Sequence, residues 1–188
     1  AASGSTCGSD SLPPLDQLSA GQTTAATIAP AQLTANASAA DKTYDGNRSA
    51  VATLSIVSGL VGNETLGAAA TASFNSKDVL SATTVTVDGV TLLDGGNGGL
   101  AGNYVLAPGQ TAAARITPRL IDSATAVASN KVYDGNTSAS ALVSLAAGQL
   151  VGSETLGTTA SAHFDSKDVT TASRVTIDGV TLSDGANG

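Results

Sequence analysis

The sequence predicts an all-β protein: two tandem β-sandwich (Ig-like) repeat domains, preceded by an N-terminal extension that carries a donor strand. The first observation behind this prediction is the composition. Hydrophobic residues make up 41% of the 188 residues, while 12% are charged and 3% are aromatic. A chain with so much apolar and so little charged sequence is expected to be ordered. Its abundant small and β-branched residues favour pleated sheets with thin cores.

The second observation is an internal repeat with a period of about 90 residues. Residues 61–92 read VGNETLGAAATASFNSKDVLSATTVTVDGVTL, and residues 151–182 read VGSETLGTTASAHFDSKDVTTASRVTIDGVTL. Upstream, KTYDGN at 42–47 matches KVYDGN at 131–136. This period is long enough for a whole small domain, so each copy is expected to fold around its own core.

The third observation is that the signals inside each copy are those of β-strands. The TVTVDGVTL stretch and its counterpart alternate apolar and polar residues and break at Asp-Gly. No segment sustains a helical period. Residues 59–66 are long enough only for a short helical turn, which we expect to be capped by Asn63. Ser153 is the equivalent cap in the second copy.

The two ends of the chain do not match. Residues 103–118, NYVLAPGQTAAARITP, predict two strands around an Ala-Pro-Gly-Gln turn and complete the first repeat. Ala112, Ala114 and Ile116 are expected on one face of the second strand. Nothing equivalent follows the second repeat, but residues 15–30, LDQLSAGQTTAATIAP, align with 103–118 without a gap. The expected domains are therefore an extension (1–30), a complete repeat (31–118) and a repeat that lacks its last strands (119–188).

An incomplete sheet has an open edge and an uncovered core, which is costly and prone to aggregation. We expect residues 15–30 to fill the second repeat of a neighbouring copy by strand addition. Such a head-to-tail contact builds an open filament unless it closes into a ring. The expected acceptor groove lies near Phe164, Val175 and Ile177, and the expected donor residues are Leu15, Leu18, Thr24, Ala26 and Ile28.

The mismatch between the ends has two further interpretations. The chain can be a segment cut from a longer repeat array, or its leader can fold back onto its own second repeat. The chain begins Ala-Ala-Ser without Met, as after signal-peptide cleavage, and this predicts a secreted, cell-surface protein. Cys7, the one cysteine, is either a spare thiol or a disulfide partner between chains.

Several motifs together resemble a known family. K-x-Y-D-G-N, F-x-S-K-D-V, V-D-G-V-T-L, N-Y-V-L and a closing A-x-I-x-P are similar to the YDG repeat of bacterial filamentous-haemagglutinin-like surface proteins and adhesins. The resemblance covers about residues 31–188. It implies an exported, mainly structural β module without catalytic residues. It also supports a second interpretation, in which the chain is a stalk segment of a large adhesin of the two-partner-secretion type.

The YDG motifs themselves are expected to be structural turns, in which Asp bonds backbone N–H groups, Gly takes a positive φ and Tyr packs at a sheet edge. These residues are Tyr44, Asp45, Gly46, Tyr133, Asp134 and Gly135. We expect no cofactor. The alternative is that acidic turns hold Ca²⁺, with Asp45, Asp78, Asp134 and Asp168 as ligands, although their spacing matches no known calcium loop.

Enzymatic activity is not expected. The one histidine, His163, has Ser73 as its counterpart in the first repeat, so any triad would exist in one copy only. Three Tyr and two Phe are few for a sugar platform, which also disfavours a third interpretation, a glycan-binding module. A net charge of −7 without a basic run disfavours nucleic acid, and no apolar stretch is long enough to span a membrane. The expected partners are other copies of the chain and a host or matrix surface.

Overall fold

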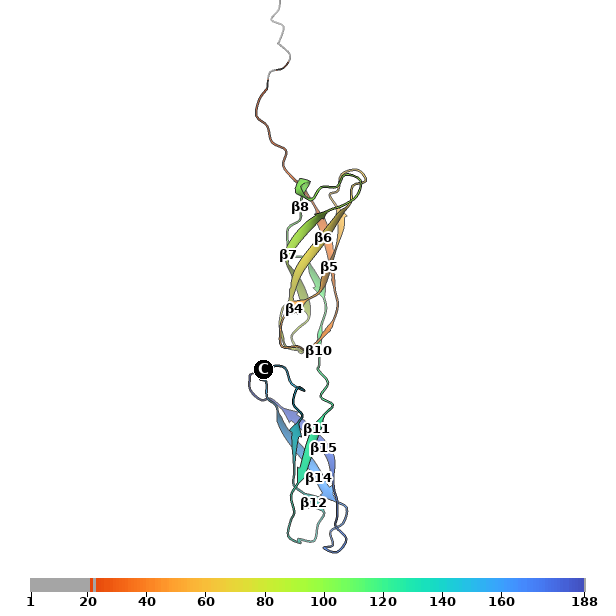
Figure 1. Cartoon of the computed structure of the whole chain (residues 1–188), viewed down its shortest axis with the longest axis vertical. Helices are drawn as coiled ribbons and strands as arrows, with labels where there is room; N and C mark the ends of the chain where they lie inside the picture. Colours follow the sequence, from red (N-terminus) through yellow and green to blue (C-terminus); the bar gives the residue numbers. More distant parts are fainter. Residues whose placement is uncertain (1–20, 22, 188) are drawn as a thin grey trace, which may run out of the picture.

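The computed structural model describes residues 21 and 23–187 of the chain. Every strand pairing joins residues within 31–117 or within 124–183. We call residues 31–117 the first unit and residues 119–187 the second unit; the two lie end to end (Figure 1). The all-β class predicted from the sequence is confirmed. No helix among the described residues is long and apolar enough to cross a membrane.

The first unit contains a four-stranded antiparallel sheet in the order β4-β6-β7-β9, and β2 pairs with β5 in a second antiparallel ribbon. Two short parallel pairs, β1 with β8 and β3 with β10, close the edges. The elements are β1 (Ala31–Gln32), β2 (Thr34–Ala39), β3 (Lys42–Thr43), β4 (Ser49–Ala50), β5 (Ala52–Ser58), β6 (Leu66–Phe74), β7 (Thr84–Asp94), a 3-10 turn η1 (Ala101–Asn103), β8 (Tyr104–Val105), β9 (Thr111–Ala113) and β10 (Ile116–Thr117).

The second unit repeats part of this arrangement. Its sheet has the order β12-β14-β15, equivalent to β4-β6-β7, and β11 pairs with β13 as β2 pairs with β5. Even a register shift recurs, between Thr71 and Ala72 in β6 and between Ser161 and Ala162 in β14. The strands are β11 (Ala124–Ala128), β12 (Ser138–Ala139), β13 (Ala141–Leu145), β14 (Gly157–Phe164) and β15 (Val175–Ser183).

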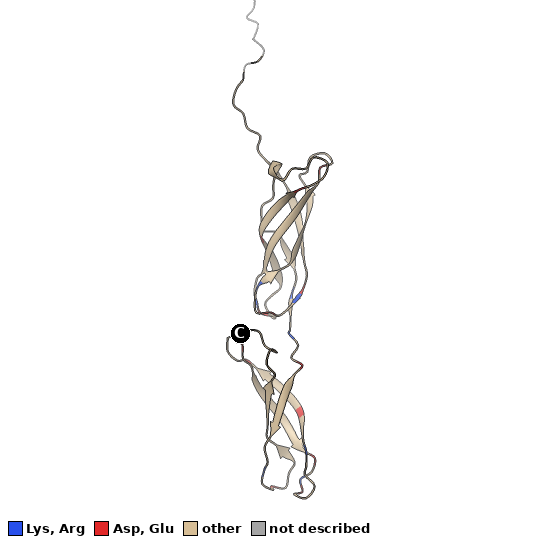
Figure 2. Cartoon of the chain, in the orientation of Figure 1, with Lys and Arg blue, Asp and Glu red and all other residues tan. Residues whose placement is uncertain are grey.

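The first unit has a closed core made of two clusters. One surrounds Phe74, which is fully buried, and the other surrounds Leu33, which is 2% exposed. Alternate residues of the strands point into these clusters, as the period-2 pattern predicted. Charged residues are scattered along the chain, and most of the strand residues are uncharged (Figure 2).

The second unit is built from similar residues, yet its core is open. Within its described residues, Val143 is the one hydrophobic side chain that reaches the buried class. Val180 and Leu182 on β15 are 47% and 45% exposed. The same kinds of residue therefore pack tightly in one unit and remain accessible in the other.

The helical turn expected at residues 59–66 is wrong. The structure has a single hydrogen-bonded turn there, closed by the Glu64 N–H donating to the Val61 carbonyl at 3.1 Å. Gly62 takes a φ of +57°, which a right-handed helix cannot continue through, and β6 begins at Leu66. Asn63 therefore caps no helix.

Candidate functional site

One segment, residues 104–117, closes the first unit. Its β9 strand extends the four-stranded sheet at the edge of β7, while β8 and β10 pair with β1 and β3. Further backbone bonds join the Gly109 N–H to the Val87 carbonyl and the Val87 N–H to the Gln110 carbonyl, both at 2.9 Å. The segment therefore satisfies an edge of β7 and bridges to the strands at the start of the unit.

The same segment supplies side chains to both clusters of the core. Ala114 and Ile116 are 4% and 2% exposed and join the cluster around Phe74. Tyr104 and Leu106, at 6% and 8%, join the cluster around Leu33. The predicted alternation of Ala112, Ala114 and Ile116 on one face is confirmed by their burial.

Tyr104 also anchors the segment through its hydroxyl. The hydroxyl donates to the Glu64 carboxylate, at Oε2, and accepts a hydrogen bond from the Val61 N–H at 3.1 Å. The bond to the Glu64 carboxylate holds the pKa of the Tyr104 phenol above its ordinary value. A polar contact thus fixes the end of the segment where β8 begins.

No described residue of the second unit occupies the equivalent position. Within the described residues, strand β15 pairs with β14 alone and leaves its other edge open. The predicted acceptor residues Phe164, Val175 and Ile177 lie along β14 and β15 and are half-buried. Their counterparts in the first unit, Phe74, Val85 and Val87, are 0%, 1% and 1% exposed. The surface of β14 and β15 around these three residues has a hollow at each end, and both hollows are described below. We call this surface, with its two hollows, the acceptor groove.

A larger hollow of about 510 Å³ lies at the end of the groove next to the first unit. Its lining includes Ile121, Leu150, Glu154 and Leu156. The repeat aligns these residues with Leu33, Leu60, Glu64 and Leu66, which contact Tyr104 or pack in its cluster. The wall that the second unit contributes therefore corresponds to the place that Tyr104 and Leu106 fill in the first unit. Tyr44, Asp78 and Val79 of the first unit line the opposite side of this hollow.

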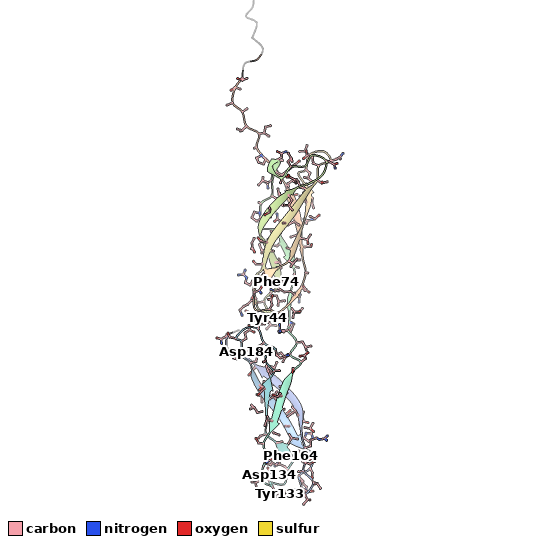
Figure 3. The ribbon with its side chains drawn as sticks, viewed as in Figure 1. Tyr44, Phe74, Tyr133, Asp134, Phe164 and Asp184 are labelled. Atoms are coloured by element: carbon pink, nitrogen blue, oxygen red, sulfur yellow. The ribbon has the colours of Figure 1, made fainter. Side chains whose placement is uncertain are left out.

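A smaller hollow of about 200 Å³ lies at the other end of the groove. Its lining includes Tyr133, Phe164, Val169 and Ala172. Their counterparts Tyr44, Phe74, Val79 and Ala82 pack around Ile116 in the first unit. Figure 3 places Tyr133 and Phe164 at the end of the second unit that faces away from the first. The two hollows thus match the two ends of the closing segment.

The predicted donor residues are only partly described. Leu15, Leu18 and Cys7 lie outside the described residues. Thr24, Ala26 and Ile28 lie in an extended stretch before β1, and all three are exposed. Ile28 is 100% exposed, which is unusual for a large apolar side chain.

Both YDG motifs form tight loops with the same internal bonds. Asp45 accepts from the Lys42 ammonium at 2.8 Å and from the Asn47 N–H at 3.2 Å, and Gly46 takes a φ of +79°. The hydrogen bond from Lys42 lowers the pKa of the Asp45 carboxyl. In the second unit, Asp134 accepts from Lys131 and Asn136 at 2.8 and 3.2 Å, and Gly135 has a φ of +80°.

The four aspartates proposed as calcium ligands each lie beside a lysine. Asp78 pairs with Lys77 at 2.9 Å, and Asp168 pairs with Lys167 at 2.8 Å, in the same way that Asp45 and Asp134 are paired. No three His, Cys, Asp or Glu side chains in the described ranges gather closely enough to hold a metal ion. His163 lies on the exposed face of β14 and pairs with Asp178 at 2.8 Å.

Asp165 in the second unit accepts the backbone hydrogen bonds that Asn75 accepts in the first unit. Asp165 Oδ1 accepts from the backbone N–H groups of Ser173 and Arg174 at 2.9 and 3.2 Å. In the first unit, Asn75 Oδ1 accepts the equivalent bonds from Thr83 and Thr84. The bonds from Ser173, followed by the bond from Arg174, lower the pKa of Asp165 to about 2.

This difference predicts a pH-dependent contribution to stability from Asp165 that Asn75 cannot make in the first unit. Since the folded pKa lies below the ordinary 3.8, Asp165 stabilises the fold above about pH 4, and this contribution is lost as the pH falls toward 2. Replacing Asp165 by Asn, the residue of the first unit, is expected to keep the bonds and remove this dependence. Thermal melts of both proteins from pH 5 to 2 measure it, and parallel curves would contradict the assignment.

The comparisons with known proteins bear on the whole chain. The model of the YDG domain matches residues 16–113 and again residues 117–188. The chain belongs to the YDG domain family. The comparisons with curated proteins and with solved structures returned no match. The second match coincides with the second unit, and the first covers most of the first unit together with residues 16–30 before it. We therefore refer to the two as the first and second YDG units.

Proposed function

We propose that this YDG protein is the subunit of a secreted bacterial filament. Residues 15–30 of one copy would fill the acceptor groove in the second YDG unit of the next copy by donor-strand complementation. The observation that carries the proposal is the match between the two hollows of the groove and the side chains of residues 104–117. In this proposal the two units are tandem Ig-like β-sandwiches, spanning 31–118 and 119–188, and 1–30 is the donor extension.

The donor matches the buried face of the closing segment at three positions, whereas Tyr104, which anchors that segment to Glu64, aligns with Asp16. Ile28 aligns with Ile116, Ala26 with Ala114 and Leu18 with Leu106. Each of these counterparts is at most 8% exposed in the first unit. The fully exposed Ile28 side chain would enter the smaller hollow, against Phe164. Burying an isoleucine side chain in this way contributes about 1.5–3 kcal/mol.

The backbone of the groove also suits a strand. The closing segment of the first unit pairs antiparallel with β7 through Thr84, Val85 and Thr86. The equivalent edge of β15, which begins at Val175, is unpaired among the described residues. A strand added there would satisfy its backbone N–H and C=O groups, which are a ready template for pairing.

The reach of the chain favours a second copy as the source of the strand. Ile28 lies three residues before β1, and three extended residues span at most about 11 Å. The smaller hollow lies at the far end of the second unit, beyond the whole first unit (Figures 1 and 3). Ile28 therefore cannot enter the groove of its own chain while β1 stays in place. A donor from another copy gives an open, head-to-tail chain.

A second candidate function is a stalk of a large adhesin, which the end-to-end arrangement of the units favours (Figure 1). In that case a continuation of the same polypeptide would fill the groove, and the protein would space a binding tip from the cell. The groove is common to both functions, and the source of its strand separates them.

The test is the state of purified full-length chains and of a variant without residues 1–30. We expect the full-length protein to form filaments in electron micrographs and the variant to remain monomeric. Adding a synthetic peptide of residues 15–30 to the variant should restore the stability of its second unit without restoring filaments. Filaments of undiminished length from the variant would overturn the proposal, as would a full-length protein that stays monomeric at all concentrations.

A further inference from the structure

The YDG turn of the first unit forms the joint with the second unit. Tyr44 donates its hydroxyl hydrogen to the Glu154 carboxylate, at Oε1, and this bond raises the pKa of the Tyr44 phenol. A Cβ placed on Gly46 would lie 2.9 Å from Val151 Cγ1, so the turn sits directly on that side chain. Figure 3 shows Tyr44 at the junction, on the side of the first unit that faces the second.

Each of the two surfaces that meet in this joint has a repeat-related copy elsewhere in the chain. These copies lie on the 131–136 loop of the second unit and the 61–64 loop of the first unit. The second YDG turn carries Tyr133, which is 58% exposed, and Gly135, which has no atom within 4 Å of its would-be Cβ. Figure 3 places Tyr133 and Asp134 at the free end of the second unit. The counterpart of the 151–154 loop is residues 61–64 of the first unit, where Val61 is 61% exposed.

These outer surfaces already have the shape of the inner joint. Gly46 and Gly135 have φ values of +79° and +80°, and Gly62 and Gly152 both have +57°. The Glu64 N–H to Val61 carbonyl bond and its counterpart from Glu154 to Val151 are both 3.1 Å long. Neither surface would have to reorganise in order to dock, which keeps the entropic cost of association low.

We propose that the YDG turn is a docking element between consecutive units, and that Tyr133 and Gly135 dock on Val61 and Glu64 of a second copy. This inference rests on the proposed filament, in which the donor strand brings the two surfaces together. The Tyr133 hydroxyl would donate to Glu64 as Tyr44 donates to Glu154. Tyr104 uses one of the two oxygens of the Glu64 carboxylate, and the other has no hydrogen-bond partner among the described residues, so it can accept this bond.

The glycine of the motif acquires a second role in this arrangement. Besides adopting a positive φ, Gly46 leaves the space into which Val151 fits, and Gly135 would leave the same space for Val61. A side chain at either position would clash with the methyl groups of the valine opposite and separate the loops. The turn thus combines a conformational requirement within a unit with a steric requirement between units.

Disulfide trapping tests the joint. The would-be Cβ of Gly46 lies 3.8 Å from Val151 Cβ, a separation that suits a disulfide. On a Cys7→Ser background, Val61→Cys with Gly135→Cys should give a ladder of linked chains after oxidation with copper phenanthroline. Gly46→Cys with Val151→Cys is the matched control and should link within one chain, giving a faster-migrating monomer on a non-reducing gel.

The outcomes separate the two proposals. Filaments without a ladder, while the control pair becomes oxidised, would overturn the joint and leave donor-strand assembly standing. Absence of filaments from the unmodified full-length protein would overturn both. If the strained Gly135→Cys variant does not assemble, Tyr133→Ala decides: a critical concentration raised by about tenfold or more supports the joint, and an unchanged one overturns it.

Discussion

Replacing Ile28 by aspartate is expected to abolish filament formation. Ile28 aligns with Ile116, whose side chain is 2% exposed in the first YDG unit. The variant would lose about 1.5–3 kcal/mol of apolar burial. It would also place a carboxylate without a partner in the hollow beside Phe164, which costs several kcal/mol more. A total above about 4 kcal/mol corresponds to a thousandfold or greater loss in the association constant at each contact.

Sedimentation and electron microscopy at a series of concentrations measure this loss. Val51→Asp is a matched control, because Val51 is another exposed apolar side chain, at 79%, but has no place in the donor segment. It should leave assembly unchanged, and Ile28→Leu should weaken assembly slightly. If Ile28→Asp chains assemble as readily as the unmodified protein, residues 15–30 are not the donor.

Truncating the two equivalent phenylalanines is expected to have unequal effects on stability. Phe74 is fully buried in the cluster that contains Ile116, so Phe74→Ala should cost about 3–5 kcal/mol of unfolding free energy. Phe164 is half-buried and borders an existing hollow, so Phe164→Ala should cost about half as much in monomeric protein. The inequality follows from the open groove and not from the residue type.

Both variants are best made with Ile28→Asp, which keeps the chains monomeric, and compared by urea unfolding with hydrogen exchange to separate the two units. Adding the peptide of residues 15–30 should then make Phe164→Ala as costly as Phe74→Ala, since the peptide would bury the ring. Equal costs without peptide would mean that the second unit is already closed, and that the groove is no binding site.

Much of the fold could be predicted from the sequence because the chain repeats itself. The alternation in TVTVDGVTL predicted strands that appear as β7 and β15. The break expected at Asp-Gly is wrong, because both strands continue through that pair with only a shift in register. The alignment of 15–30 with 103–118 indicated which segment the second repeat lacks, and the alternation of Ala114 and Ile116 gave the buried face. These features depend on neighbouring residues or on the repeat, so they can be recognised in the sequence.

Two other features of the fold could not be predicted from local pattern or from the repeat. The short parallel pairs, β1 with β8 and β3 with β10, join residues about 75 positions apart and have no local pattern. The turn at residues 59–66 resembled a helix start because Asn63 is a good cap, but one positive-φ glycine and the nearby start of β6 prevailed. Residue types alone did not reveal these outcomes.

The order of residues is enough to establish that the protein is a β-rich tandem of YDG units and that residues 15–30 duplicate a closing segment. What that segment does became clear only in three dimensions: residues 104–117 bury Phe74 and Leu33 in one unit, while Phe164 stays half-exposed in the other. The contact of Tyr44 with Glu154, a partner 110 residues away, also depends on the folded arrangement. Local pattern specifies strands and faces, whereas burial and contact between units depend on which segments meet in space.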